Sequence, residues 1–309
     1  MSDNATKLGE MDLEEFRRSG HQIVDWIADY LACPERYPVL SRSQPGEIMA
    51  QLPEAPPETA EEMGTILADF EKIILPGITH WNHPGFHAYF SVSGSGPGIL
   101  GEMLTAALNV NAMLWRTSPS ATELEDVTLA WLRELLGLDE DWQGVITDGA
   151  SASSLLAIAA AREGLGLDIR QRGMAGRSDL PRLRLYISDQ THSSVEKGSI
   201  TLGIGQEGVR HIASDQDFRL DVEELDQAIE EDLAAGWLPF FVAATVGTTA
   251  TTSIDPVREI GEICRRYGLW LHVDGAYGAA AAVVPEMAHV LDGLEMADSF
   301  VMNPHKWLF

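Results

Sequence analysis

The residues best suited to covalent chemistry are a lysine and an aspartate close to the C-terminal end of the sequence. Lys306 follows an apolar run at residues 299–302 and stands between His305 and Trp307. An amine at the carboxyl end of a buried strand is partly desolvated, which lowers its pKa and leaves more of the neutral form that attacks a carbonyl carbon. A lysine on the rim of a surface loop is the alternative interpretation of the same residues.

Asp274 ends a second apolar run, residues 269–273, and is followed by the small residues Gly275 and Ala276. A carboxylate at the end of a buried strand needs a partner because its desolvation is costly; the candidates are a helix N-cap, an arginine or a protonated ring nitrogen. One helical unit separates Asp274 from Lys306, so we expect both side chains at neighbouring strand ends. A Schiff base lysine and a carboxylate on a pyridinium nitrogen are what pyridoxal 5'-phosphate requires.

The segment 148–154 offers a site for the phosphate of that cofactor. It follows a short β run and opens a helix of small residues. Backbone N–H groups at a helix N-terminus, together with the Ser151 hydroxyl, bind anions even in an acidic chain. Asp148 is unfavourable beside a dianion, so we expect its side chain to point away or to cap the helix. Taken alone, the segment is equally a serine-rich N-cap.

Two loops after other apolar runs carry further polar side chains. His192 lies in residues 188–194, where a neutral imidazole is suited to stacking on a cofactor ring; an ordinary loop histidine is the alternative. Residues 245–252 supply several threonine hydroxyls, which suit hydrogen bonds to a phenolic oxygen or a carboxylate. Threonine after a strand is also common turn chemistry.

The elements that must position these side chains alternate along the chain. Short β runs alternating with helical windows predict an α/β fold with a mostly parallel sheet and helices on both faces. Ligands bind beyond the carboxyl ends of strands in such sheets, where the segments above fall. We predict strands at 144–147, 183–188, 209–213, 240–245, 269–274 and 299–303, and helices at 152–163, 193–201, 221–235, 256–267 and 286–292.

The N-terminal part has a different sequence pattern, with helical segments and a proline-rich stretch in place of alternating β runs and helices. A helix is expected to begin at Asp12, with Glu15 completing a capping box, and to stop near Cys33 and Pro34. The proline-rich residues 34–57 predict an extended strap. Further helices are expected at 59–75, 99–110 and 120–136. We therefore divide the chain into an N-terminal helical and strap segment, residues 1–80, and a large domain, residues 81–309.

Composition excludes several classes of protein. The chain has 309 residues with 47 Asp and Glu against 21 Lys and Arg, a net charge of −26. Such a chain lacks the excess of cations that nucleic acids or anionic membrane surfaces attract. Two cysteines cannot build a disulfide framework or a zinc cluster, and we predict no metal site. The polar N-terminus and the absence of a long apolar run predict a soluble, cytoplasmic protein. A nucleotide-binding protein is disfavoured, since no glycine-rich phosphate motif follows the first β run.

Taken together, three runs of sequence resemble the group II pyridoxal-phosphate decarboxylases. They are Asn-Pro-His-Lys-Trp at 303–307, His-Val-Asp-Gly-Ala-Tyr at 272–277 and Asp-Gln-Thr-His-Ser-Ser-Val-Glu at 189–196. Further matches lie at 83–90, 118–125 and 244–249, so the resemblance covers the chain from about residue 10 onward. The similarity is strongest to the aromatic-L-amino-acid branch, which also contains plant aldehyde synthases.

The resemblance implies an aspartate aminotransferase-like fold (fold type I), a homodimer wrapped by the N-terminal helices, and decarboxylation of an L-amino acid, with an aromatic one expected, to an amine and CO2. It assigns Lys306 as the Schiff base lysine, Asp274 as the ring-nitrogen partner and His192 as the stacked ring. The remaining matches are Ala150, Ser151, Asn303 and His305 at phosphate-holding positions or beside the lysine, and Thr249 and Ala276 along the cofactor.

Departures from the family pattern leave alternatives open. Residues 89–92 and 111–113 differ from the usual substrate-facing segments, and Asp148-Gly149 replaces a frequent Gly-Ser pair. Relatives continue well beyond the position of Phe309, so we expect this chain to be part of a longer polypeptide that lacks the small C-terminal domain. An aldehyde synthase on the same fold and a non-catalytic truncated cofactor-binding chain are the competing hypotheses.

Overall fold

The computed structural model describes residues 11–90 and 94–309 and divides into two units, Met1–Ser91 and Val92–Phe309. The polar leader with Lys7, and Ser91 and Val92 of the unusual substrate-facing segment, lie outside the described residues. From the sequence, we divide the chain after residue 80 and expect residues 1–80 to wrap a second subunit. Both statements stay predictions. Each unit is described by itself below.

The first unit contains the long amphipathic helix that the sequence predicts. Helix α1, Leu13–Ala32, begins after Asp12, whose side chain accepts a hydrogen bond from the backbone N–H of Glu14 at 2.8 Å. This contact satisfies one of the free amide groups of the first turn. The helix ends at Cys33, before Pro34, as expected from the restriction that proline places on the preceding residue.

Aromatic residues hold this unit together around a buried histidine. His80 is 2% exposed, and its Nδ1 lies 3.0 Å from the Tyr30 hydroxyl, while its ring stacks on Tyr37 at 4.8 Å between centroids. Trp26 of α1 stacks on Tyr30 and meets Phe70 edge-on. Burial lowers the pKa of His80, which favours the neutral form of the ring in this packing.

Two expectations for this unit need correction. The proline-rich segment contains 3-10 turns at Pro34–Arg36 (η2) and Met49–Gln51 (η3) and is not extended throughout. The second helix, α2, spans Met63–Asp69 and continues as a π-helical turn, η4 (Phe70–Ile74), and a 3-10 turn, η5 (Leu75–Gly77). It starts four residues later than predicted. Residues 58–62 are all exposed, so no packing rewards helix formation there.

The second unit is built on a parallel sheet of five strands in the order β2-β1-β3-β4-β5. A parallel pair needs a crossover connection, and helices supply it. Ala243, His272 and Ser299 lie side by side in the register, as do Thr245, Asp274 and Val301. The strands are β1 (Arg182–Ser188), β2 (Val209–Ile212), β3 (Trp237–Thr245), β4 (Trp270–Asp274) and β5 (Ser299–Val301).

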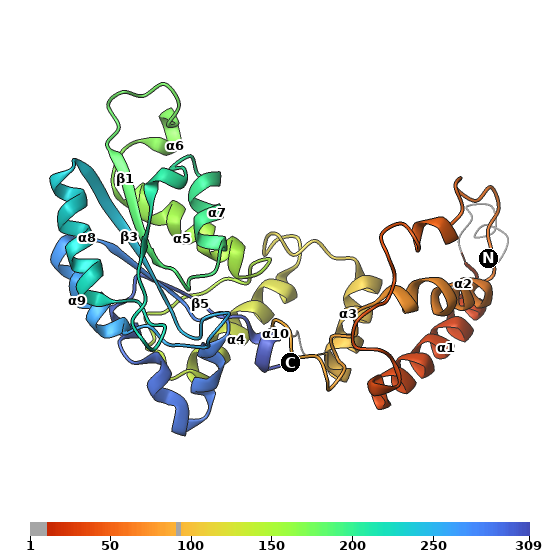
Figure 1. Ribbon diagram of the computed structural model, residues 1–309. Helices are drawn as coiled ribbons and strands as arrows, with labels where there is room; N and C mark the ends of the chain where they lie inside the picture. Colours follow the sequence, from red (N-terminus) through yellow and green to blue (C-terminus); the bar gives the residue numbers. More distant parts are fainter. Residues whose placement is uncertain (1–10, 91–93) are drawn as a thin grey trace. The chain divides into compact units, whose positions relative to one another are not determined.

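Helices cover both faces of the sheet (Figure 1). On one face pack α5 (Ala150–Gly164) and α7 (Ser194–Thr201), whose Ala157, Ile158 and Val195 are buried against β1 and β3. On the other face pack α8 (Val222–Ala234) and α9 (Val257–Tyr267). The remaining elements are α3 (Gly96–Leu108), α4 (Pro119–Leu135), α6 (Ile169–Arg172), η6 (Gln206–Gly208), η7 (Gly278–Val283), η8 (Pro285–Leu291), η9 (Leu294–Met296) and α10 (Pro304–Trp307).

The α/β prediction is thus confirmed, with three local corrections. Residues 144–147 belong to none of the described strands; the backbone N–H of Ile146 donates to Glu125 Oε1 at 2.7 Å and not to a neighbouring strand. The predicted helix at 286–292 is the 3-10 helix η8. Strand β3 begins at Trp237, where the Arg182 and Arg184 guanidiniums stack 3.6 and 3.5 Å from the indole ring.

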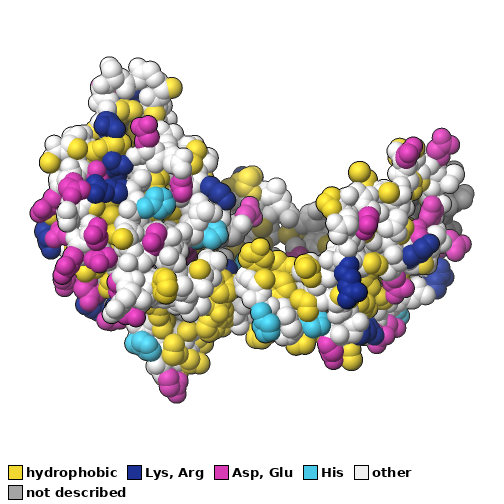
Figure 2. All heavy atoms as spheres, viewed as in Figure 1, with side chains coloured by type: hydrophobic (Ala, Val, Ile, Leu, Met, Phe, Trp, Pro, Cys, Tyr) yellow, Lys and Arg dark blue, Asp and Glu magenta, His cyan; other side chains and the backbone are white. Residues whose placement is uncertain are grey.

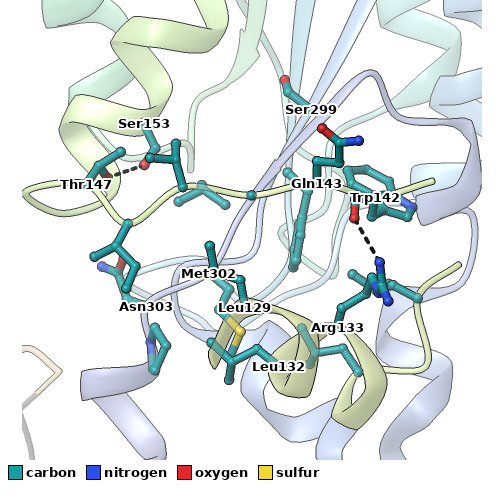
Figure 3. Close-up of a pocket in the computed structure, with 18 of the residues that line it drawn as sticks. Leu129, Leu132, Arg133, Trp142, Gln143, Thr147, Ser153, Ser299, Met302 and Asn303 are labelled. Carbon is teal, nitrogen blue, oxygen red and sulfur yellow. Dashed lines mark hydrogen bonds between the residues drawn. The ribbon is translucent and has the colours of Figure 1, made fainter. Parts of the chain in front are cut away.

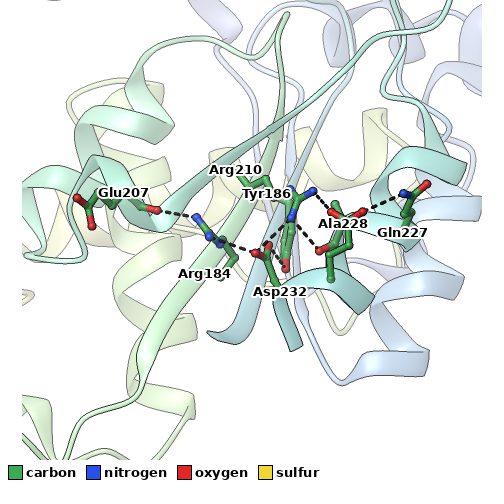
Figure 4. Close-up of polar contacts among 8 residues, drawn as sticks. Arg184, Tyr186, Glu207, Arg210, Gln227, Ala228 and Asp232 are labelled. Carbon is green, nitrogen blue, oxygen red and sulfur yellow. Dashed lines mark hydrogen bonds and ion pairs between the residues drawn. The ribbon is translucent and has the colours of Figure 1, made fainter. Parts of the chain in front are cut away.

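A buried ion cluster ties β1 and β2 to α8 (Figure 4). Asp232 is 3% exposed and lies 3.1 Å from Arg184 and 3.2 Å from Arg210, and it accepts a hydrogen bond from the Tyr186 hydroxyl. Burial raises the pKa of Tyr186, and the charge of Asp232 raises it further. Two arginines around one carboxylate compensate the buried charge, so the cluster anchors α8 on the sheet.

The visible face of the second unit carries many Asp and Glu side chains with Lys and Arg interspersed among them (Figure 2). This agrees with the net charge of −26. Within residues 11–90 and 94–309, no helix combines the length and apolar composition needed to cross a bilayer.

Candidate active site

The predicted site residues of the second unit gather at the carboxyl edge of the sheet. His192 follows β1, Thr249 follows β3, Asp274 ends β4 and Lys306 follows β5. All four strands are parallel, so these ends share one edge. Neighbouring strands are about 4.8 Å apart, so side chains at adjacent strand ends can contact the same small ligand.

Asp274 lies at the centre of this edge and is 5% exposed. Its Oδ1 accepts a hydrogen bond from the backbone N–H of Ala276 at 3.0 Å, and its carbonyl oxygen accepts one from Val246 N–H at 2.8 Å. The first contact is a local turn and not the helix N-cap expected among the alternatives, since the next helical segment, η7, has Tyr277 as its N-cap. A carboxylate has about four acceptor positions, so one amide leaves capacity for a ring nitrogen.

Gly275 allows the chain to turn tightly after Asp274. A Cβ atom at this position would come within 2.7 Å of both Ala279 Cβ and Phe300 Cε2. The backbone N–H of Gly275 donates to Val301 O at 2.9 Å, which fixes the turn on β5. The absence of a side chain therefore sets the path that carries Ala276 past the end of the strand.

The segment that carries Lys306 is bound to this turn. Asn303 N–H donates to Ala276 O at 3.3 Å, and the Trp307 ring meets Tyr277 edge-on at 4.9 Å between centroids. Lys306 itself lies in α10, a single helical turn, and is partly buried. Burial lowers the pKa of the amine, and the negative charge of Asp274 opposes that shift. The structure thus brings the two residues singled out from the sequence into one electrostatic environment.

The candidate phosphate site lies at the N-terminus of α5. Gly149 is the N-cap residue and has a φ of +104°, a conformation that favours glycine. Ala150 and Ser151 form the first turn, where amide groups have no partner within the helix. Ser151 is exposed, as is Asp148. Gly149 and not Asp148 is the N-cap residue, so of the two expectations for Asp148 its exposure agrees with a side chain that points away, and the capping alternative is excluded.

A large cavity adjoins this helix end. It has a volume of about 1400 Å³, and it extends from residues 147–149 to Asn303 and His305 and along apolar side chains of α4. Figure 3 shows Thr147 and Ser153 facing each other across a 2.7 Å hydrogen bond on one side of it, with Asn303 close by. Residues 147–149, just before the first turn of α5, and the start of the Lys306 segment therefore share one solvent-accessible space.

His192 and Thr249 make no described contact with Asp274. His192 is exposed, and its Nδ1 accepts a hydrogen bond from Ser194 N–H at 3.2 Å, which leaves the proton of a neutral ring on Nε2. Thr249 is exposed in the turn after β3.

Five buried polar atoms in the described part of this unit have no hydrogen-bond partner: the Nε atoms of Arg162 and Arg184, and three on β3, β4 and α5 that sequence reasoning missed. Thr245 Oγ1, His272 Nε2 and Ser154 Oγ have no hydrogen-bond partner within the described part of the chain. Thr245 and His272 adjoin Asp274, and Ser154 lies in the second turn of α5. Buried polar atoms without partners are rare and point to an additional polar group. The residues at this edge therefore fit a ligand that is both polar and anionic, as pyridoxal phosphate is.

Comparison with known proteins agrees with this geometry. Residues 45–309 match the family described as the pyridoxal-dependent decarboxylase conserved domain, and the chain belongs to that family. It is 44% identical to tyrosine decarboxylase 2 of Arabidopsis thaliana, over 98% of this chain and 57% of that protein. The fold is that of the pyridoxal-phosphate enzymes of fold type I.

Solved structures show the same similarity. The 4-hydroxyphenylacetaldehyde synthase of Rhodiola rosea superposes with a TM-score of 0.90 at 40% identity, over 96% of this chain and 64% of that one. The structure of Oryza sativa TDC with PLP and tryptamine superposes with a TM-score of 0.89 at 35% identity, over 96% and 65%. The chain therefore spans less than two thirds of the length of these relatives.

Proposed function

We propose that this chain forms the cofactor-binding part of a pyridoxal-phosphate-dependent carboxy-lyase that acts on an L-amino acid with an aromatic side chain. The observation that carries the proposal is the buried carboxylate of Asp274 beside the Lys306 segment at the carboxyl edge of the sheet. Membership of the decarboxylase family supports the reaction, and the names of the plant relatives support the aromatic substrate.

When bound, pyridoxal phosphate supplies an aldehyde for the substrate amine and a protonated ring that accepts the electron pair released as the Cα–carboxylate bond breaks. Asp274 holds the proton at the ring nitrogen, because a buried carboxylate favours a neighbouring cation. Lys306 would hold the cofactor through its aldehyde group, and its amine, once replaced by that of the substrate, would carry a proton to the substrate Cα. Partial desolvation lowers the pKa of that amine and so increases the share of its neutral, nucleophilic form.

Other residues orient and screen the reacting groups. The first-turn amides of α5 at Ala150 and Ser151, with the Asn303 side chain and His305, hold the phosphate, since helix N-termini favour anions. The His192 ring would cover one face of the cofactor, and Ala276 and Thr249 would line its edge.

A second reaction on the same site has a specific argument in its favour. The Rhodiola rosea relative is an aldehyde synthase that shares the fold at 40% identity. The two reactions differ in product, since the aldehyde route consumes dioxygen and releases ammonia and hydrogen peroxide besides CO2. Measuring amine against aldehyde from the same substrate separates them. A chain that binds the cofactor without turnover is the third outcome.

The proposal extends to assembly and location. A second copy of the chain is the proposed partner, which the exposed apolar side chains of the first unit support: Leu13, Phe16, Leu40 and Met49 are each more than 60% exposed. A reducing, cytoplasmic setting is supported by the two unpaired cysteines, exposed Cys33 and buried Cys264.

Borohydride trapping tests the central assignment. The protein is incubated with pyridoxal phosphate, reduced and digested, and the labelled peptide is identified by mass spectrometry. We expect the label on Lys306 and its loss in Lys306→Ala, while Lys197→Ala, a change at an exposed position on α7, keeps it. Label on Lys197 or on no lysine contradicts the proposal.

A further inference from the structure

Two polar atoms beside Asp274 are buried without a partner in the part of the chain that the structure describes. Thr245 is 4% exposed and its Oγ1 lacks a hydrogen bond; His272 is 1% exposed and its Nε2 lacks one. Leaving a buried donor unsatisfied costs about 1–3 kcal/mol. No contact in the described structure offsets this cost. We therefore expect each atom to gain a hydrogen-bond partner when a ligand binds.

Both atoms lie on the same face of the sheet as the Asp274 side chain. Thr245 on β3 is paired with Asp274 in the register, and His272 precedes Asp274 by two residues on β4. Side chains two residues apart in a strand point to the same face. Leu271 and Val273 belong to the core beneath α8 and α9, which places His272 and Asp274 on the opposite face, under α5.

The hydrogen bonds of His272 indicate where its proton lies. Trp270 Nε1–H donates to Ser299 Oγ at 2.8 Å, and Ser299 Oγ lies 2.9 Å from His272 Nδ1. Indole is only a donor, so the arrangement with the fewest unpaired groups has the serine hydroxyl donating to Nδ1, which leaves only the Nε2–H of His272 without a partner. The imidazole proton is then on Nε2. Burial lowers the pKa of His272 to about 4, so the ring is neutral near pH 7.

We propose that Thr245 and His272 are positioning residues that donate hydrogen bonds to the Asp274 carboxylate once the cofactor ring is in place. The inference rests on the proposed function and deepens it. Of about four acceptor positions on the carboxylate, Ala276 N–H takes one and the ring nitrogen a second. The Thr245 hydroxyl and the His272 Nε2–H take the remaining two. Both donors are neutral. They therefore orient the carboxylate of Asp274 and leave its negative charge available to stabilise the protonated ring nitrogen.

Substitutions that remove one hydrogen at a time test this inference. Thr245→Val keeps the shape of the side chain and removes the hydroxyl, and Thr245→Ser restores it. His272→Asn retains an acceptor for Ser299 but removes the Nε2–H, and His272→Gln returns a donor at the longer reach. Thr201→Val, at an exposed position on α7, is the matched control.

Three quantities are measured: the dissociation constant for pyridoxal phosphate, the visible absorbance of the bound cofactor, and the thermal unfolding midpoint of the cofactor-free protein. We expect Thr245→Val and His272→Asn to weaken binding about ten- to hundredfold and to change the absorbance, which reports protonation of the ring. Thr245→Ser and His272→Gln should recover most of both, and Thr201→Val should change neither.

The unfolding midpoint separates positioning from structural support. Removing an unpartnered buried hydroxyl should leave the cofactor-free Thr245→Val protein as stable as the unaltered chain, or more so. Cofactor affinity and absorbance unchanged in Thr245→Val, or affinity losses that simply follow lost stability, overturn the inference. If the unaltered protein does not bind pyridoxal phosphate at Lys306, the proposed function itself is wrong, and this result is distinct from an unchanged affinity in the variants.

Discussion

Asn303 donates its backbone N–H to the carbonyl oxygen of Ala276, and this 3.3 Å contact joins the turn after Asp274 to the turn that carries Lys306. The two turns follow neighbouring strands, β4 and β5, whose register sets Asp274 beside Val301. A backbone contact of this kind depends on the path of the chain and not on side-chain identity. The relative position of acid and amine is therefore built into the sheet edge.

The coupling between Asp274 and Lys306 predicts a shift in the lysine pKa. Asp274→Asn removes the negative charge that opposes the effect of burial, so the pKa of Lys306 should fall further below its usual value. The measurement is the pH dependence of labelling of Lys306 by an amine-specific reagent in the cofactor-free protein, followed by peptide mass spectrometry. Lys197 in the same sample is the internal control. A pKa of Lys306 that stays constant or rises would disprove the coupling.

Gly275 is predicted to tolerate no side chain. Gly275→Ala places a Cβ against Ala279 and Phe300, and overpacking of this kind costs about 1–3 kcal/mol of unfolding free energy. The turn must also shift, so cofactor affinity should fall. Urea denaturation and cofactor titration measure the two effects. The control is Gly164→Ala at the end of α5, where a Cβ meets nothing within 4 Å; equal stability of the two variants contradicts the prediction.

The buried ion cluster should matter for stability and not for cofactor binding. Asp232→Ala leaves Arg184 and Arg210 without their shared carboxylate, and breaking a buried pair in this way costs about 3–5 kcal/mol. Urea denaturation should show this loss. Glu224→Ala, at an exposed position on the same helix, should stay within about 0.5 kcal/mol of the unaltered protein. A loss for Asp232→Ala as small as that of the control would show that the cluster is dispensable.

His272 predicts a pH dependence of stability with a definite sign. Its pKa lies at about 4 in the folded protein, below the ordinary value of 6.5, so the unfolded chain binds the proton more tightly between these values. The stabilising contribution of neutral His272 to the free energy of unfolding is complete above about pH 6.5 and is lost as the pH falls. Between about pH 7 and about pH 5 it amounts to about 2 kcal/mol.

This contribution is isolated by comparison with His272→Asn. Buried Asp255, whose pKa is raised to about 6, acts in the opposite direction, because its stabilising contribution is lost as the pH rises. The free energy of unfolding is therefore measured for both proteins at both pH values. The unaltered protein should lose more stability on acidification than His272→Asn does. Equal losses would show that His272 titrates normally.

Much of this protein could be read from residue order alone. The alternation of apolar β runs with helical windows predicted the parallel sheet, because the period of the apolar residues reflects which faces must be buried. The rarity of lysine near apolar strand ends singled out Lys306, and its spacing from Asp274 implied neighbouring strands. The family match covers the same residues.

Other features depended on the tertiary structure. The β-rich residues 144–147 remain outside the described sheet because a strand exists only when a neighbour completes its hydrogen bonds. Thr245 and His272 had no local pattern that marked them; they matter because the register sets one beside Asp274 and the packing of α5 buries both atoms. Sequence periodicity determines which face a side chain takes, whereas the unsatisfied polar atoms at that face are decided by contacts between residues far apart in the chain.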